Sequence, residues 1–270
     1  MSDQKVCLTI AGLDPSGGAG IIADIKAFSA FGCFATAAVS SLTFQNTTGV
    51  FGAVHQDAST IRGQIEAVMD DFDVAAVKTG MLPTREVIEE TARIMSERGV
   101  KTLVVDPVVR STSGYDLIDD AALRVLIEKL FPLSLVVTPN IQEAERNSGI
   151  SISTPADIES AARTMLSMGA ANVLMKGGHS FDSENGKARD HLFDSEGRVH
   201  VFDAEYIDTT ATHGTGCTLA AAIAANLALG KSLSDAVRTA KDLVTEAIRT
   251  SRHLGRGHSP INIPSNFTIS

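Results

Sequence analysis

The chain has 270 residues and a net charge of −9, with 44% hydrophobic and 20% charged residues. This composition supports one large packed core, and the absence of a Lys- and Arg-rich patch disfavours a nucleic-acid ligand. No apolar segment has the length of a membrane span, and no N-terminal segment has the pattern of a signal peptide. We therefore expect a soluble cytoplasmic protein that associates with neither nucleic acid nor membrane.

Short apolar segments alternate with helix-like segments along the chain. Most of the apolar segments carry no charge before their last residue, which is typical of strands covered on both faces. The predicted strands are Val6–Ile10, Ala35–Leu42, Ala75–Lys78, Thr102–Asp106, Leu135–Thr138 and Val173–Lys176. Alternating strands and helices predict an α/β fold with a mostly parallel sheet between two layers of helices.

Several predicted helices have recognisable ends. Glycines precede a helix over Ile21–Phe31, and a second helix begins after Thr84 and ends at Gly99. Thr154 is followed by a first-turn proline and an acidic residue, which predicts a capped helix that runs to Gly169.

The last third of the chain contains a predicted hairpin and two long helices. The sequence HLFDSEGRVHVF, with its turn at residues 195–197, indicates an antiparallel hairpin at a sheet edge. One helix follows Cys217 and another runs from about Ser234 to Ser251. We see no linker, repeat or low-complexity segment, so we expect one domain over residues 1–270.

Polar residues follow three of the predicted strands, where parallel α/β sheets bind ligands. Asp106 ends one strand, Asn140 and Glu143 follow the next, and Lys176 ends a third. The acids can hold Mg²⁺ beside phosphates, and the lysine can neutralise a phosphate. A turn residue before proline, a first-turn helix acid and a solvated lysine are the alternative structural explanations. Because all four residues are expected at the same edge of the sheet, a ligand-binding site is favoured over these separate explanations.

The sequence THGTGCT at residues 212–218 places glycines and a thiol at the start of a helix. The backbone N–H groups of Gly214, Thr215 and Gly216 can converge on an anion there, aided by the helix dipole. The same field is expected to lower the pKa of the Cys217 thiol and make it a base for a hydroxyl that attacks a phosphate. A buried structural thiol is the simpler alternative.

The three cysteines, Cys7, Cys33 and Cys217, show no CxxC pair and no metal-ligand spacing. Isolated thiols suit a reducing compartment. His213 and Cys217 could also form a cysteine-hydrolase pair, but they are too close along one tight loop to guarantee that their side chains face each other.

Two glycine patterns resemble nucleotide-binding motifs but lack a required part. GAGIIA at residues 18–23 resembles a dinucleotide fingerprint, yet no Asp or Glu occurs between Ile25 and Gln56 to bind a ribose. GKS at residues 230–232 resembles the end of a P-loop, but position 225 is Ala and a helix precedes it. We interpret the first as a turn that opens a helix and the second as a helix stop followed by a cap.

Taken together, these motifs resemble the ribokinase-like superfamily, and within it the hydroxymethylpyrimidine/phosphomethylpyrimidine kinases of thiamine biosynthesis. The resemblance covers nearly the whole chain and keeps the family's order. It rests on TIAGLDPSGGAGIIADIKAFSAFG, TFQNTTGV, VKTGML, DPVV with a following TSG, TPNIQEAE, MKGGH, THGTGCTLAAAIAA and LGRGHSPIN.

The resemblance implies a role for each matching residue. Cys217 would be the catalytic base, beside an anion hole formed by Gly214, Thr215 and Gly216. The aminopyrimidine would be bound by Gln45, whose planar amide offers both a donor and an acceptor. The pocket around it would be lined by Gly12, Asp24, Met81 and Val108. ATP would be contacted by Lys176, Lys241, Asn140 and Thr210. Mg²⁺ would be organised by Asp106 and Glu143.

The implied activity is ATP-dependent phosphorylation of 4-amino-5-hydroxymethyl-2-methylpyrimidine and then of its monophosphate, by a cytoplasmic homodimer. A pyridoxal or pyridoxine kinase of the same fold is the first alternative, because its substrate is also a flat heterocycle with a hydroxymethyl group. A catalytically silent ligand-binding protein on a kinase scaffold is the second. Phe44, Ala211 and Ser259 depart from the family's usual residues, and Phe44 is expected to reshape the substrate pocket.

Overall fold

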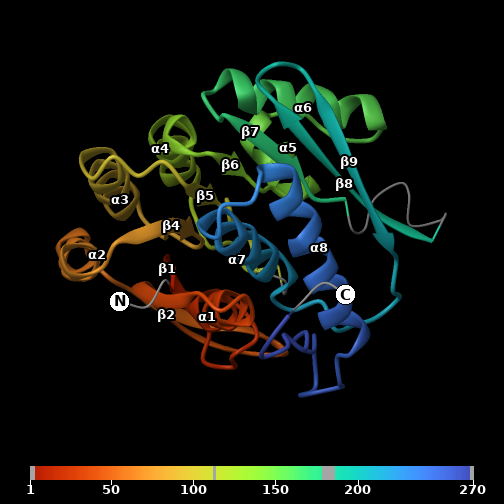
Figure 1. Cartoon of the computed structure of the whole chain (residues 1–270), viewed down its shortest axis with the longest axis horizontal. Helices are drawn as coiled ribbons and strands as arrows, with labels where there is room; N and C mark the ends of the chain where they lie inside the picture. The colour runs from red at the N-terminus through yellow and green to blue at the C-terminus, as the bar shows by residue number, and fades with distance from the viewer. Residues whose placement is uncertain (1–3, 112–113, 178–185, 268–270) are drawn as a thin grey trace.

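The structure is a computed structural model that describes residues 4–111, 114–177 and 186–267 (Figure 1). Within these residues the strands form a nine-stranded sheet in the order β3-β2-β1-β4-β5-β6-β7-β8-β9. The strands are β1 Val6–Leu13, β2 Phe34–Asn46, β3 Gly49–His55, β4 Val74–Thr79, β5 Leu103–Val105, β6 Val136–Val137, β7 Asn172–Met175, β8 Lys187–Asp194 and β9 Val199–Glu205. Neighbouring strands from β2 to β7 are parallel, and β3, β8 and β9 are antiparallel to their neighbours.

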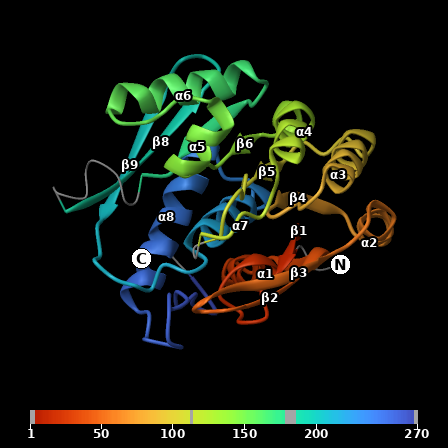
Figure 2. The ribbon, with the colours of Figure 1, turned by 180° about the vertical axis from the view of Figure 1, so that it is seen from behind.

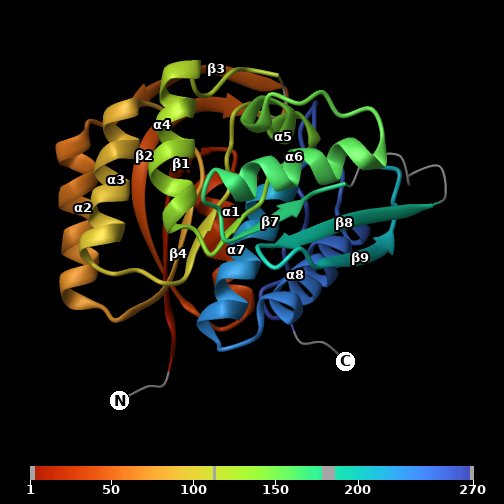
Figure 3. The same ribbon diagram turned by 90° about the horizontal axis from the view of Figure 1, so that it is seen from above.

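Helices cover both faces of the sheet (Figures 2 and 3). They are α1 Gly20–Ala30, α2 Ala58–Asp71, α3 Arg85–Glu97, α4 Asp120–Leu130, α5 Ile141–Ser148, α6 Pro155–Ser167, α7 Thr215–Ala228 and α8 Leu233–Arg249. One hydrophobic core lies under α2 to α6 and a second lies under α1, α7 and α8. The three-layer α/β/α architecture is therefore confirmed.

The helix α7 is buried along almost its whole circumference because it is sandwiched between the sheet, α1 and α8. Its alanine-rich sequence provides small side chains on every face, which lets the neighbouring elements approach closely. The site-bearing end of this helix is therefore fixed by packing along its length.

The helix starts that were predicted from capping residues are confirmed. Thr84 caps α3 by accepting from Val87 N–H, and Thr154 forms a capping box with Asp157 at the start of α6. Gly230, with φ of 84°, and the N-cap Ser232 connect α7 to α8, as the non-P-loop interpretation required.

Each predicted strand is present, and the late hairpin forms β8 and β9 at one edge of the sheet (Figure 1). The strand β3 at the opposite edge, beside β2, was not predicted. Its sequence GVFGAVH contains two glycines and lacks a regular alternation of apolar and polar residues. The parts of the TSG and MKGGH motifs at residues 112–113 and 178–179 lie outside the described residues.

Across the described ranges, none of the helices combines the length and the apolar character that crossing a membrane requires.

Candidate active site

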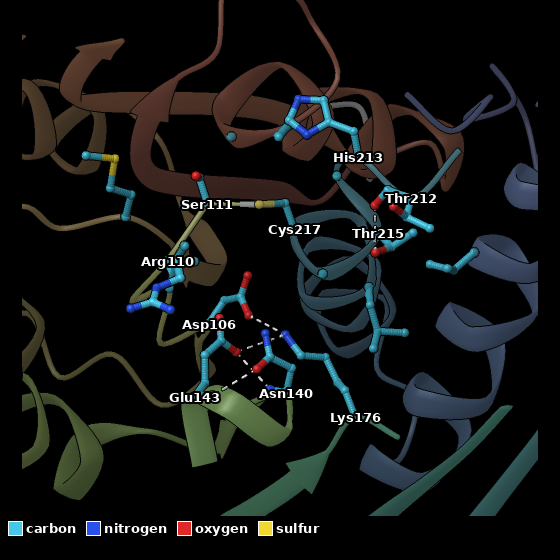
Figure 4. Close-up of a pocket in the computed structure, with 18 of the residues that line it drawn as sticks. Asp106, Arg110, Ser111, Asn140, Glu143, Lys176, Thr212, His213, Thr215 and Cys217 are labelled. Carbon is cyan, nitrogen blue, oxygen red and sulfur yellow. Dashed lines mark hydrogen bonds and ion pairs between the residues drawn. The ribbon is translucent and has the colours of Figure 1, made fainter. Parts of the chain in front are cut away.

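A cavity of about 820 Å³ opens where β1, β4 and β5 end and where α5 and α7 begin (Figure 4). Its position at the carboxyl ends of the parallel strands agrees with the sequence analysis. The predicted residues that line it are Gly12, Gln45, Met81, Asp106, Val108, Asn140, Glu143, Lys176, Gly214, Thr215, Gly216, Cys217 and Lys241. Residues that are up to 229 positions apart in the chain thus share one cavity, because the parallel strands end together.

Two predicted site residues are not part of this lining. Asp24 is fully buried in α1, and its carboxylate is bound to Lys78 and Thr9 instead of facing the cavity. Thr210 is exposed on the segment that leads to α7 and lies outside the cavity lining. The expectation that Asp24 lines the substrate pocket is therefore wrong.

The N-terminus of α7 lacks the usual capping groups. Its N-cap is Gly214, with φ of 85°, so no side chain bonds the first N–H groups, and the first turn contains no acidic residue. A Cβ on Gly216 would lie 3.2 Å from Lys176 Nζ, which shows how close this ammonium comes to the first turn. A helix start without a side-chain cap and an adjacent cation both favour a negative charge at this place, although Thr215 N–H donates to Thr212 C=O at 3.3 Å.

The environment of Cys217 shifts the pKa of its thiol in the direction opposite to the expected one. Burial raises the pKa of the Cys217 thiol to about 11, although the positive charge of Lys78 acts in the opposite direction. The expectation of a lowered pKa is wrong in the ligand-free protein, because desolvation of the thiolate outweighs the helix N-terminus. Ionisation of this thiol is therefore opposed by burial and favoured by the nearby Lys78 cation.

A buried ion pair supplies this cation. Lys78, at the carboxyl end of β4, places Nζ 2.9 and 3.0 Å from the two carboxylate oxygens of Asp24. Thr9 Oγ1 donates to the same carboxylate at 2.6 Å. Lys78 also lines the cavity, and its charge favours the Cys217 thiolate. Lys78 was not identified from the sequence, although it ends a predicted strand as Lys176 does.

The carboxylates at the neighbouring strand ends share Lys176 (Figure 4). Lys176 Nζ is 2.9 Å from Asp106 Oδ1 and 3.6 Å from Glu143 Oε2. Burial opposes ionisation of Asp106, but Lys176 and Lys78 hold the pKa of this carboxyl below its usual value. Burial raises the pKa of Glu143 to about 7, against the opposing charge of Lys176.

Asn140 and Glu143 also form a capping box at the start of α5. The Asn140 side chain accepts from Glu143 N–H, and the Glu143 carboxylate accepts from Asn140 N–H at 2.8 Å. Glu143 is therefore both an acid in the first turn of a helix, as the alternative explanation predicted, and a residue of the cavity lining. One Glu143 oxygen serves the helix cap, and this contact fixes the carboxylate at the cavity wall.

The donor set fits a magnesium ion that is held mainly by substrate and water. No cluster of three or more His, Cys, Asp or Glu ligands occurs in the described part of the chain. Asp106 and Glu143 nevertheless face one point closely enough to share a single ammonium group. Mg²⁺ in kinases is bound through one or two carboxylates together with phosphate oxygens and water, so this pair is sufficient.

Lys241 is also paired. Its Nζ lies 2.6 Å from Asp190 Oδ2, and Asp190 Oδ1 accepts from Gly177 N–H at 2.9 Å. Asp190 thus ties the helix α8 to the segment directly after Lys176. Asp190 was not identified from the sequence, because it lies just before the predicted hairpin and belongs to none of the motifs.

His213 does not form a hydrolase pair with Cys217. Its Nε2 is bonded to Asp14 Oδ2 at 2.8 Å. Burial acts to raise the pKa of Asp14, but hydrogen bonds from His213, Gln45 and Ser16 hold this pKa well below its usual range. Asp14 was not identified from the sequence, because its partner is 199 residues away.

The departures from the family pattern lie around the cavity and not inside it. Phe44 is 56% exposed and does not line the cavity, so the expectation that it reshapes the substrate pocket is wrong. The pairing of β2 with β3 shifts its register between Phe44 and Gln45, and of these two residues only Gln45 lines the cavity. Ala211 is buried, and its N–H donates to Thr209 Oγ1. Ser259 is buried, and its hydroxyl bonds both Leu254 N–H and Leu254 C=O.

Comparisons with known proteins agree on one family. The sequence pattern of the phosphomethylpyrimidine kinase family matches residues 14–262. The hydroxymethylpyrimidine/phosphomethylpyrimidine kinase of Haemophilus influenzae is 44% identical over 262 residues, which are 97% of each chain.

Solved structures show the same fold. The phosphomethylpyrimidine kinase of Clostridium difficile superposes with a TM-score of 0.79 at 41% identity, and the match covers 91% of this chain and 100% of that one. The ADP complex of Bacillus subtilis pyridoxal kinase superposes with a TM-score of 0.87 at 36% identity, covering 97% of this chain and 98% of that one.

Proposed function

This chain belongs to the phosphomethylpyrimidine kinase family, and from that membership we propose that it is an ATP-dependent phosphotransferase of thiamine biosynthesis. Its substrates are 4-amino-5-hydroxymethyl-2-methylpyrimidine and then the monophosphate of this compound. The observation that carries the proposal is the uncapped N-terminus of α7, which faces the same cavity as Cys217, Lys176 and the two carboxylates. The proposed anion site, base and cation thus line one cavity.

In the proposed mechanism the substrate hydroxymethyl group lies beside Cys217, which takes the hydroxyl proton on its sulfur as the oxygen attacks the γ-phosphorus of ATP. The oxygen–phosphorus bond forms and the bond to the β-phosphate oxygen breaks, which releases ADP. The backbone N–H groups at the start of α7 and the Lys176 ammonium stabilise the charge on the transferred phosphoryl group. Lys78 and Lys176 both favour the thiolate form of Cys217.

ATP and Mg²⁺ would occupy the part of the cavity between α5 and α8. Lys241 and Asn140 line this part, and we propose that Lys241 and Lys176 contact the phosphates while Asp106 and Glu143 hold Mg²⁺. When bound, Mg²⁺ neutralises phosphate charge and orients the γ-phosphoryl group. The contribution of Thr210 stays a prediction, since Thr210 lies outside the cavity lining.

Gln45 is the proposed recognition group for the aminopyrimidine ring. It lies on β2, across the cavity from Lys176, and shares the lining with Gly12, Met81 and Val108. An amide can pair with an amino group and a ring nitrogen in one plane, whereas the apolar neighbours pack on the ring face.

We further propose that residues 1–270 act as one kinase domain in a cytoplasmic homodimer. The free thiols Cys7, Cys33 and Cys217 are compatible with a reducing compartment, where ATP is also available. Sedimentation equilibrium at micromolar protein concentration would measure the oligomeric state directly.

Pyridoxal phosphorylation is the second candidate, because a pyridoxal kinase shares this fold with a TM-score of 0.87. The test is to incubate the purified protein with Mg-ATP and either the aminopyrimidine alcohol or pyridoxal, and to follow the products by mass spectrometry. Sequential formation of the mono- and diphosphate of the pyrimidine supports the proposal. Product from pyridoxal alone would assign the enzyme to vitamin B6 metabolism, and no product from either substrate would favour a silent scaffold.

A further inference from the structure

Two glycine-rich loops meet beside the cavity, one before α1 and one before α7. A Cβ on Gly214 would lie 1.8 Å from the Gly18 carbonyl oxygen, and a Cβ on Gly18 would lie 2.4 Å from the His213 ring. No side chain other than hydrogen fits at either position. The two loops are therefore in direct backbone contact, and displacement of one requires displacement of the other.

The Asp14 carboxylate joins these loops through its side-chain contacts. Asp14 Oδ1 accepts from Ser16 N–H and Oγ–H at 2.8 and 2.7 Å, and Oδ2 accepts from Ala19 N–H at 2.8 Å. The same Oδ2 lies 2.8 Å from His213 Nε2. Because an ionised carboxylate only accepts hydrogen bonds, His213 is the donor through Nε2. One buried carboxylate thus shapes the first loop and holds the second.

The backbone of His213 is also fixed from its other side. Its N–H donates to Ser259 C=O at 3.2 Å, and its C=O accepts from Ile261 N–H at 3.4 Å. His213 directly precedes Gly214, which has no capping side chain of its own to hold the start of α7. The position of the first N–H groups of α7 is therefore set through His213.

We propose that Asp14 and His213 form a positioning pair that holds the Gly214–Gly216 anion site in register with the loop before α1 during phosphoryl transfer. The inference rests on the proposed function. Neither side chain supplies the proton acceptor or the anion donors; the pair acts through the backbone of Gly214. A displacement of about 1 Å in such a site lowers turnover on the order of 100-fold.

The test compares His213→Ala, His213→Gln and the control His200→Ala, which removes an exposed histidine from β9. Steady-state kinetics with the aminopyrimidine and Mg-ATP give kcat and KM, and calorimetry gives the affinities of Mg-ADP with and without aluminium fluoride, a mimic of the transferred phosphoryl group. In His213→Ala we expect kcat to fall about 10- to 100-fold, with both KM values changed less than about twofold. His213→Gln retains an N–H donor for Asp14 and should recover most of kcat.

The calorimetric readout distinguishes positioning from general stability. In His213→Ala, Mg-ADP should bind as in the wild type, whereas the additional affinity conferred by aluminium fluoride should fall at least tenfold. Normal kcat in His213→Ala would overturn the proposal. Equal losses of kcat in His213→Ala and His213→Gln, with the additional affinity conferred by aluminium fluoride unchanged, would also overturn it. Absence of product from the wild type would instead overturn the proposed function, and the role of the pair with it.

Discussion

The ammonium of Lys78 lies 2.9 Å from the carboxylate of Asp24, and neither side chain reaches solvent. Burial opposes the charge of Lys78, yet Asp24 and the nearby Cys217 and Asp106 hold the pKa of Lys78 above its usual value. A fully buried charge of this kind is maintained by its partner, so the two residues act as a unit.

Lys78→Met should therefore destabilise the protein by about 3–5 kcal/mol, because it leaves the Asp24 carboxylate buried without a counter-charge. Urea unfolding at pH 7 measures the change. The double variant Lys78→Met with Asp24→Asn removes both charges and should recover a large part of the loss. Lys129→Met on the surface of α4 is the matched control and should change stability by less than about 0.5 kcal/mol. A cost for Lys78→Met no larger than that of the control would contradict this account.

Cys217→Ala should lower kcat by about 100- to 10,000-fold while the substrate still binds, because the proposed base is lost and the rest of the cavity is kept. Rapid-quench kinetics and substrate titration check the two parts separately. Cys33→Ala, which removes a buried thiol remote from the cavity, should leave turnover intact. Normal turnover of Cys217→Ala would remove the base assignment.

The pH dependence of turnover follows from the same thiol. Its pKa of about 11 means that the thiolate fraction rises with pH throughout the neutral and mildly alkaline range. Where proton transfer limits the rate, kcat/KM should therefore increase about tenfold per pH unit from about pH 7 to 9. Cys217→Asp introduces a base that is already ionised in this range, so its profile should be flat. A flat profile in the wild type would show that the thiol does not limit the reaction.

Gln45→Ala should raise KM for the aminopyrimidine about 10- to 100-fold, as expected for the loss of two hydrogen bonds of about 1 kcal/mol each with their packing. KM for ATP should change less than about twofold, since Gln45 lies on β2, away from the proposed nucleotide residues. Gln56→Ala, just beyond β3, is the matched control. Equal increases in both KM values would place Gln45 outside the pyrimidine pocket.

Glu143 should make the ligand-free protein less stable as pH rises. The folded protein binds the Glu143 proton up to a pKa of about 7, whereas in the unfolded chain the group ionises near its usual value of 4.5. Between these values the folded state holds more protons, so unfolding free energy falls with increasing pH, in total on the order of 3 kcal/mol. Urea unfolding in EDTA from pH 4.5 to 8 should show this slope in the wild type and lose it in Glu143→Gln. An unchanged slope in Glu143→Gln would assign the effect to other groups.

The sequence predicted those parts of the molecule whose signals are local. Uncharged strand segments and the cap at Thr154 gave the central sheet and a helix start, because burial and capping leave marks within a few residues. Asp14 and Asp190 were not predicted, because each is defined as a site residue by a partner far along the chain. His213 is 199 residues from Asp14, and Lys241 is 51 residues from Asp190. The predicted direction of the pKa shift of Cys217 was wrong, because a sequence shows that a helix begins at this residue but does not show how deeply the thiol is buried.

The distance along the chain between Asp14 and His213 has a consequence for biosynthesis. At a translation rate of about 5–20 residues per second, the first glycine loop leaves the ribosome about 10–40 s before the second. The tail that holds His213, at Ser259 and Ile261, follows later still. A chain that stops before residue 213 therefore lacks the partner of Asp14, and a chain that stops before Ser259 lacks the backbone contacts that hold His213.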